Sequence, residues 1–322
     1  MKRRSNIALS VILLVFSSHT LFPQKRLKFE KLSPMINEAY GFAYGGSEDK
    51  AYALTGGDDA FNYSSVLQVY YTKLDTWTGA ILDKVPLMNF GSSIFMPNYN
   101  GLVLLGGTRP YGSSVVLNEK IRMLNLDDNS IIDLGELPYP ARNMGLAKEG
   151  NTIYFFGGST QATPRFVCSN KLFSYDMAKG HLEELTDMPM PMETQGAIVN
   201  GNLYAIGGYD QVALTGVHKY NLNSKEWTTL EPLRSPLSNT AVVQHDRFII
   251  MVGDFVKTNQ LLVYDTETDK RHYFKMNFKG RFLGASIIGD HLYVYGGLVP
   301  SPSYYVKRET YRIQVSDIIM SL

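Results

Sequence analysis

The sequence has 322 residues, of which 44% are hydrophobic and 12% aromatic, and its net charge is +1. This charge balance does not provide the basic surface that nucleic-acid binding requires, and the single cysteine, Cys168, cannot form an intrachain disulfide. We therefore expect a globular protein that is stabilised by packing and has no nucleic-acid partner.

The first 24 residues are predicted to be a secretory signal peptide. Lys2, Arg3 and Arg4 precede an apolar run over residues 7–16, and a polar stretch follows. The run is too short to span a bilayer stably. Cleavage near residues 20–24 would release a mature chain without a stable membrane span, exported to a periplasm, a cell surface or the medium. An uncleaved anchor is the alternative.

A pair of glycines recurs along the rest of the chain, each time after a short run rich in β-formers. The pairs end at residues 57, 107, 158, 208 and 297, and Gly253-Asp254 replaces a sixth pair, which gives steps of 50, 51, 50, 46 and 43 residues. This period is typical of propeller repeats. The runs before the pairs are predicted to be strands buried on both faces.

Two further sequence patterns, which we call tags, recur after the glycine pairs in the same order. A Tyr or Leu follows each pair, with a bulky residue seven positions later, as in Tyr70 and Trp77; the fifth copy has only Arg271 at this offset from Tyr264. A triplet of bulky residues at every third position comes next in three copies, where it begins at Ile131, Leu182 and Trp227. It is missing after the last copy but present at residues 29–35, so we expect residues 25–31 to supply the outer strand that the sixth unit lacks.

Together these tags resemble the kelch repeat, in which a double glycine is followed by a Tyr and a Trp. The resemblance covers about residues 25–316. It implies an all-β fold, a six-bladed kelch-type β-propeller that occupies residues 25–322 as a single domain. Stacked blades would bury one another's faces, and the N-terminal strand would close the ring as the outer strand of the last blade.

The sequence contains no nucleophile elbow, phosphate-binding loop or dinucleotide motif, and its histidines do not have metal-ligand spacing. We expect no cofactor and no metal. Function must then come from the loops between the second and third strands, which emerge on the same side of the disc as the crossings from one blade to the next. We call this side the loop face.

The loop face is expected to carry a ring of polar residues of mixed sign. The blade crossings supply Glu38, Asn89, Arg142, Glu193, Asn239 and Arg281. The second-to-third-strand loops supply the cations Arg109, Arg165 and Lys257. Such a set suits a polar ligand with hydroxyls or a carboxylate. The alternative is that these residues only satisfy one another.

Asp254 breaks the glycine pattern. Exported six-bladed kelch proteins include the N-acetylneuraminate epimerases, or sialic acid mutarotases, and Gly253-Asp254 followed by Lys257 is similar to their acid after a glycine with a basic residue nearby. Here Asp replaces Glu, Lys replaces Arg, and the loop is shorter. The resemblance implies Asp254 as a catalytic proton-transfer group. A surface Asp in a shortened loop is the alternative.

Two functions from different classes follow. The first is an exported, non-catalytic binding propeller that recognises a protein or a glycan through its loop face, and it is the one we favour. The second is a carbohydrate-active enzyme, a mutarotase for an acidic sugar, in which Asp254 transfers the proton and Arg142, Arg281 or Lys257 holds the sugar carboxylate. A structural role in the cell envelope is a more distant third. The fold alone does not decide among them.

Overall fold

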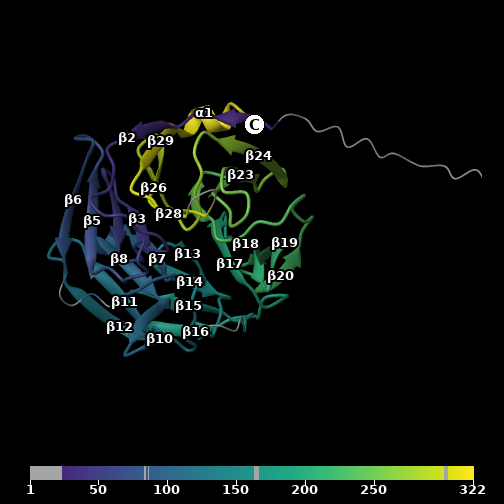
Figure 1. The fold of residues 1–322 in the computed structure, drawn as a ribbon. Coiled ribbons are helices and arrows are strands. Elements are labelled where there is room, and N and C mark those ends of the chain that lie inside the picture. Colours follow the sequence, from purple (N-terminus) through teal and green to yellow (C-terminus); the bar gives the residue numbers. More distant parts are fainter. Residues whose placement is uncertain (1–23, 83–84, 86, 163–166, 301–303) are drawn as a thin grey trace, which may run out of the picture.

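A computed structural model describes residues 24–82, 85, 87–162, 167–300 and 304–322. In this part of the chain, six sheets of antiparallel strands stand around a central axis (Figure 1). The predicted six-bladed β-propeller is thus confirmed. The predicted signal peptide lies outside the described residues, apart from its last position.

Within each blade the strands run from the axis outward in chain order. The first two blades consist of β3 (Ala43–Gly46), β4 (Lys50–Leu54), β5 (Val66–Tyr71) and β6 (Thr76–Ile81), then β7 (Ser92–Met96), β8 (Gly101–Leu105), β11 (Lys120–Asn125) and β12 (Ile131–Glu136). The third and fourth consist of β13 (Gly145–Glu149), β14 (Thr152–Phe156), β15 (Leu172–Asp176) and β16 (His181–Glu184), then β17 (Glu193–Val199), β18 (Asn202–Asp210), β19 (Val212–Asn221) and β20 (Glu226–Thr229). The fifth and sixth contain β21 (Ala241–His245), β22 (Phe248–Val252), β23 (Gln260–Asp265) and β24 (Lys270–Met276), then β25 (Gly284–Ile288), β26 (His291–Tyr295) and β29 (Thr310–Gln314).

A few short elements lie outside these ladders. Two hairpins extend second-to-third-strand loops, and they are formed by β9 (Thr108–Tyr111) with β10 (Ser114–Leu117) and by β27 (Leu298–Val299) with β28 (Tyr305–Val306). The 3₁₀ turn η1 (Pro97–Tyr99) links β7 to β8, and the helix α1 (Val315–Ile319) follows β29. No helix in the described ranges is long and apolar enough to cross a membrane.

The N-terminal segment closes the ring, as the sequence predicts, but it is shared between two blades. β2 (Glu30–Leu32) pairs antiparallel with β29 and becomes the outer strand of the sixth blade. β1 (Arg26–Leu27), which the sequence analysis assigned to the same strand, instead pairs parallel with β24 of the fifth blade. In Figure 1 these purple strands lie beside the yellow C-terminal strand and helix. One segment therefore fastens two neighbouring blades.

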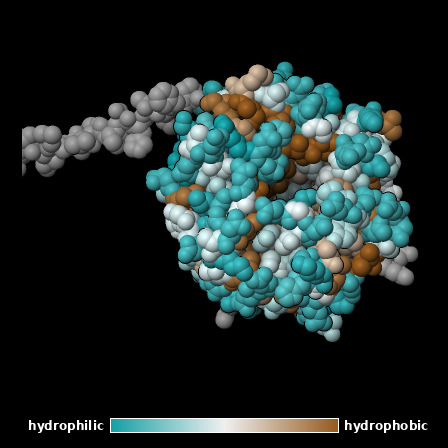
Figure 2. Space-filling view, turned by 180° about the vertical axis from the view of Figure 1, so that it is seen from behind, coloured by the Kyte–Doolittle hydropathy of each residue, from teal (hydrophilic) through white to brown (hydrophobic). Residues whose placement is uncertain are grey.

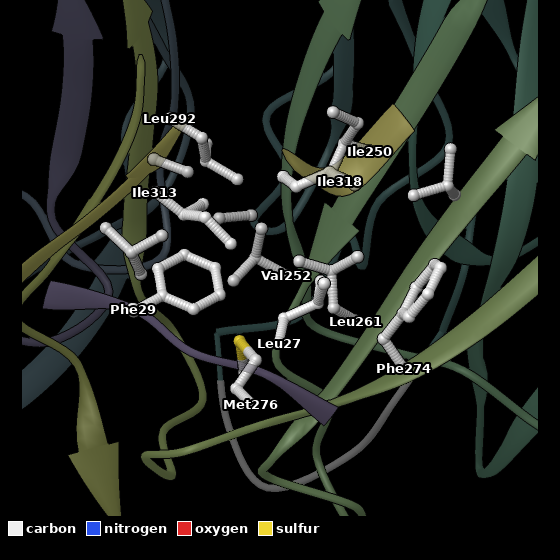
Figure 3. Packing of buried hydrophobic residues seen from close by; sticks show 14 of the residues in the cluster. Leu27, Phe29, Ile250, Val252, Leu261, Phe274, Met276, Leu292, Ile313 and Ile318 are labelled. Carbon is white, nitrogen blue, oxygen red and sulfur yellow. The ribbon is translucent and has the colours of Figure 1, made fainter. Parts of the chain in front are cut away.

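An apolar core forms where this segment meets the last two blades (Figure 3). Leu27 and Phe29 are 4% and 2% exposed, and the Phe29 ring meets Phe278 edge-on with centroids 5.1 Å apart. We call this cluster the closure seam, and its labelled members are Leu27, Phe29, Ile250, Val252, Leu261, Phe274, Met276, Leu292, Ile313 and Ile318. Burial of these side chains stabilises the closed ring.

The sequence tags have direct structural causes. At Gly106 the backbone has φ +56°, and a Cβ would lie 2.1 Å from the carbonyl oxygen of Ala141 in the next crossing, so only glycine fits. The strand β8 before it is buried along its whole length, which confirms the predicted burial on both faces. In the fifth blade, Arg271 pairs with Tyr264 and its guanidinium lies 5.1 Å from that ring, so it replaces the bulky apolar partner of the first four blades.

Candidate functional site

The disc is hollow along its axis, and Figure 2 shows the hollow at the centre of one face with hydrophobic residues beside it. On the loop face the channel opens into a cavity of about 300 Å³, which we call the loop-face cavity. Residues from the crossings and from the second-to-third-strand loops line it together. The two sets of segments that the sequence singled out therefore meet at one place.

A kink before five of the six inner strands aims the crossing residues at this cavity. Gly41, Phe90, Asn143, Asn239 and Phe282 all have φ between +50° and +61°. In four blades, the residue before the kink pairs with the residue after the strand-end turn, as in the bridges of Arg142 with Ser159 and Arg281 with Leu298. This pairing fixes the register of the crossings.

The register corrects one predicted position. In the first crossing, Tyr40 pairs with Gly57 and occupies the place that Asn89, Arg142 and Arg281 occupy in their crossings. Glu38 was chosen for this place, but it precedes Tyr40 by two residues and does not line the loop-face cavity. The chain enters the first blade from the closing strand β2 rather than from a preceding blade.

The polar side chains that line the cavity, which we call the polar wall, are Arg142, Asn143, Glu193, Asn239 and Arg281. Glu193 is 4% exposed. Its Oε1 lies 3.5 Å from Nε of Arg142, and its Oε2 accepts a hydrogen bond of 2.9 Å from Nδ2 of Asn143. Burial raises the pKa of Glu193 to about 7, although Arg142 and Asn143 both favour the charged form. This carboxyl group therefore changes charge near neutral pH.

Arg281 lies apart from this pair. Its guanidinium stacks over Phe255 at 4.0 Å from the ring centroid and lies 5.7 Å from Phe282. Nη1 donates to the carbonyl oxygen of Phe255 at 3.2 Å. No acidic side chain among the described residues forms an ion pair with it, and burial lowers its pKa. The cavity thus contains a guanidinium held by aromatic rings rather than by a carboxylate.

We call the aromatic side chains that line the cavity the aromatic wall. They are Tyr40, Phe61, Phe90, Tyr209, Phe255, Phe282 and Tyr304. Phe90 and Phe282 are 5.1 Å apart, and both rings contact Tyr40. Phe61 and Tyr304 form a separate stacked pair at 5.8 Å. Phe90 and Phe282 each follow the bridging residue of their crossing. Alignment of the crossings with one another could have revealed these two, but not the loop residues Phe61 and Phe255.

The remaining predicted residues lie elsewhere. Asn89 is buried, and its Oδ1 accepts a hydrogen bond from the backbone N–H of Phe90. Arg109 lies on β9 with its guanidinium 5.7 Å from the Tyr111 ring, and Lys257 is exposed; none of these three lines the cavity. Arg165 lies outside the described residues. Within the described ranges no three His, Cys, Asp or Glu side chains are placed to hold a metal ion.

Asp254 does not join Arg142, Glu193 and Arg281 in the cavity. It is 2% exposed, and its carboxylate accepts hydrogen bonds from the backbone N–H groups of Ser238, Val256 and Lys257, at 3.0, 3.2 and 2.7 Å. These bonds tie its own loop to the preceding crossing. The geometry favours a structural role for this acid, and its catalytic role stays a prediction.

Comparison with known proteins identifies the repeat. The family model described as KLHDC2/KLHL20/DRC7 Kelch-repeats domain matches residues 43–253. Alpha-scruin of Limulus polyphemus is 27% identical over 182 residues, which cover 52% of this chain and 20% of that protein. Kelch repeat and BTB domain-containing protein 1 of horsepox virus is 26% identical over 238 residues, which cover 71% of this chain and 40% of the viral protein.

The chain spans no more than two fifths of the length of these two curated relatives. The similarity therefore concerns the repeats rather than the whole relatives. The matched family model covers well over half of the chain, and the structure shows the repeat as four-stranded blades. The chain belongs to the kelch-repeat family.

Proposed function

We propose that this chain is a protein-interaction module whose loop-face cavity binds a short segment of a partner protein. The observation that carries the proposal is the aromatic wall, which continues from the cavity to the surface. Phe61 and Tyr304 stack on each other but remain 66% and 42% exposed. Exposed, preorganised aromatic side chains are typical anchors of binding sites.

The size and composition of the cavity support a segment rather than a folded surface. A volume of about 300 Å³ accommodates one or two side chains and not a domain. The polar wall offers guanidinium and amide donors that can fix the orientation of a peptide backbone. The blades beneath hold these loops rigidly, so little conformational entropy is lost on binding.

The test is a screen of a random peptide library displayed on phage against the purified chain. Selected peptides are then measured with the variants Phe61→Ala and Tyr304→Ala. Because both rings are exposed, neither change should unfold the propeller, and each should weaken binding by about 10-fold or more, the scale of an aromatic hot spot. Leu74→Ala is the matched control, since Leu74 is 72% exposed in the turn between β5 and β6.

Peptides that bind all four proteins equally would place the interaction elsewhere and contradict the proposal. A library that yields no binder would contradict it as well.

A carbohydrate ligand is the second candidate. It is favoured by aromatic rings beside amide and guanidinium donors, an arrangement that suits sugar faces and hydroxyls. A glycan array probed with the same variants distinguishes it, because it would give cavity-dependent binding to sugars but not to peptides.

A mutarotase would have to use Asp254, whose oxygens are engaged by three backbone N–H groups. Anomeric exchange of N-acetylneuraminate, followed by NMR with wild type and Asp254→Asn, tests this alternative. Equal rates at the uncatalysed level would contradict a mutarotase activity.

Export of the chain also belongs to this proposal and rests on the basic and apolar pattern of residues 2–16. N-terminal sequencing of the natural protein would reveal cleavage near residues 20–24.

A further inference from the structure

Arg281 carries a charge in the loop-face cavity without a counterion. The only acceptor that the described residues offer it is the carbonyl oxygen of Phe255, so most of its five N–H donors stay without a protein partner. Its Nε is buried and makes no hydrogen bond. A partly buried cation of this kind costs free energy in the unbound protein, and an anionic ligand would recover that cost.

The acidic groups nearby are already engaged. Glu193, the one acid that lines the cavity in the described ranges, pairs with Arg142 and Asn143. Asp59 accepts a hydrogen bond from the backbone N–H of Val306 at 2.6 Å and does not line the cavity. With Glu193 ionised, the two guanidiniums and one carboxylate of the polar wall leave an excess positive charge, and this charge is located at Arg281.

We infer that the cavity recognises a carboxylate of the bound peptide, which pairs with Arg281 while an adjacent apolar side chain of the peptide rests on the aromatic wall. The inference depends on the proposed peptide-binding function and names its chemical determinant. The planar guanidinium is fixed by stacking on Phe255 and lies 5.7 Å from Phe282. A fork held in this way is preorganised for two parallel hydrogen bonds to a carboxylate.

The apolar part of the determinant follows from the neighbours of Arg281. Phe282 is the next residue and contacts Phe90 at 5.1 Å between ring centroids. A ligand whose carboxylate reaches Arg281 must therefore place its next few atoms against these rings. A carboxylate two or three bonds from an aromatic or aliphatic group fits this spacing, whereas a fully hydrated acidic ligand would leave the rings in contact with water.

The test uses a small matched pair of probes, hydrocinnamate and its neutral amide, titrated by NMR into wild type and Arg281→Gln. The acid should bind wild type about 10- to 100-fold more tightly than the amide, the range of a charge-assisted hydrogen bond. In Arg281→Gln this preference should disappear while binding of the amide changes little. Arg109→Gln is the control, because Arg109 lies on the same face but outside the cavity.

An acid-to-amide ratio near one in wild type would overturn the inference, and so would a preference that Arg281→Gln leaves intact. If Arg281→Gln does not fold, the ratio in wild type and its decrease with added salt still decide the question. The proposed function fails separately, when no peptide binds. Peptides that bind through the aromatic wall without an acidic group would contradict carboxylate recognition by Arg281 but would agree with the proposed peptide-binding function.

The carboxylate can come from an acidic side chain or from the C-terminus of the partner. Selected peptides are therefore compared with C-terminally amidated versions and with versions in which Asp and Glu become Asn and Gln. Loss on amidation assigns the C-terminus, and loss on side-chain replacement assigns an internal acid. A peptide unaffected by both changes would contradict the role of Arg281.

Discussion

The closure seam and the loop-face cavity both join residues that are distant in sequence, but the seam is a cluster of apolar side chains whereas the cavity contains charged ones. The seam brings together apolar side chains such as Leu27, Phe29 and Ile318, all less than 5% exposed. The cavity instead combines exposed rings with Arg281, a cation that has no counterion among the described residues. The seam thus favours folding, whereas a partly buried guanidinium without a counterion costs stability.

The strongest way to test the seam is to remove Phe29. The substitution Phe29→Ala leaves a cavity between the last two blades, and we expect the free energy of unfolding in urea to fall by about 3–5 kcal/mol. Lys28→Ala, one residue earlier on the exposed side, should change it by no more than about 0.5 kcal/mol. Similar small losses in both variants would show that the N-terminal segment does not fold cooperatively with the ring.

The closure seam also contacts one buried charged residue, Lys307. Lys307 is 2% exposed, and its Nζ lies 5.0 Å from the Phe278 ring and 4.9 Å from the Tyr311 ring while donating to the carbonyl oxygen of Lys279 at 2.7 Å. Burial lowers the pKa of this amine from 10.5 to about 8. Between these two values the unfolded chain binds more protons than the folded one, so the free energy of unfolding rises with pH.

We therefore expect wild type to gain about 2 kcal/mol over Lys307→Met between pH 7 and pH 9.5. Denaturation curves for the two proteins across this range measure the difference, in which other titrating groups cancel. Lys73→Met, at an exposed turn, should follow the pH profile of wild type. Parallel profiles for wild type and Lys307→Met would mean that the amine keeps its solution pKa and that the seam tolerates the charge.

The fold could be predicted from the sequence because each blade repeats the same physical constraints. Gly106 shows why, since its positive φ and the close backbone of the next crossing recur at Gly157 and Gly207. The phase of the tags also predicted the closing strand. The parallel pairing of β1 with β24 could not be predicted, because Arg26 and Leu27 are too few to form a pattern.

The site was predictable only where it follows the repeat. Arg142, Glu193 and Arg281 reach the cavity because the crossings place them there. The aromatic wall depends on kinks that turn Phe90 and Phe282 toward the axis, and alternation along a strand does not reveal such turns. Asp254 stands where the other blades have a second glycine, and this departure from the repeat led to the prediction that it is a catalytic group. Its short side chain instead accepts hydrogen bonds from the backbone around its own loop.

The pH dependence of ligand binding tests whether the charges of the cavity act on a ligand. As pH falls through about 7, Glu193 takes up a proton and no longer offsets the charge of Arg142, so the cavity becomes more positive. The neighbouring thiol of Cys168 does not interfere, because burial raises its pKa to about 12. Hydrocinnamate should then bind about 5- to 10-fold more tightly at pH 6 than at pH 8, the scale of one unit charge acting over several ångströms.

The variant Glu193→Gln removes this titration and should make the affinity for hydrocinnamate nearly constant over the same range. Glu183→Gln changes an exposed acid on the outer strand β16 that pairs with Lys225 in the turn before β20, and it should keep the pH profile of wild type. Titrations by NMR at pH 6, 7 and 8 measure all three proteins. A profile that stays steep in Glu193→Gln would assign the pH dependence to another group.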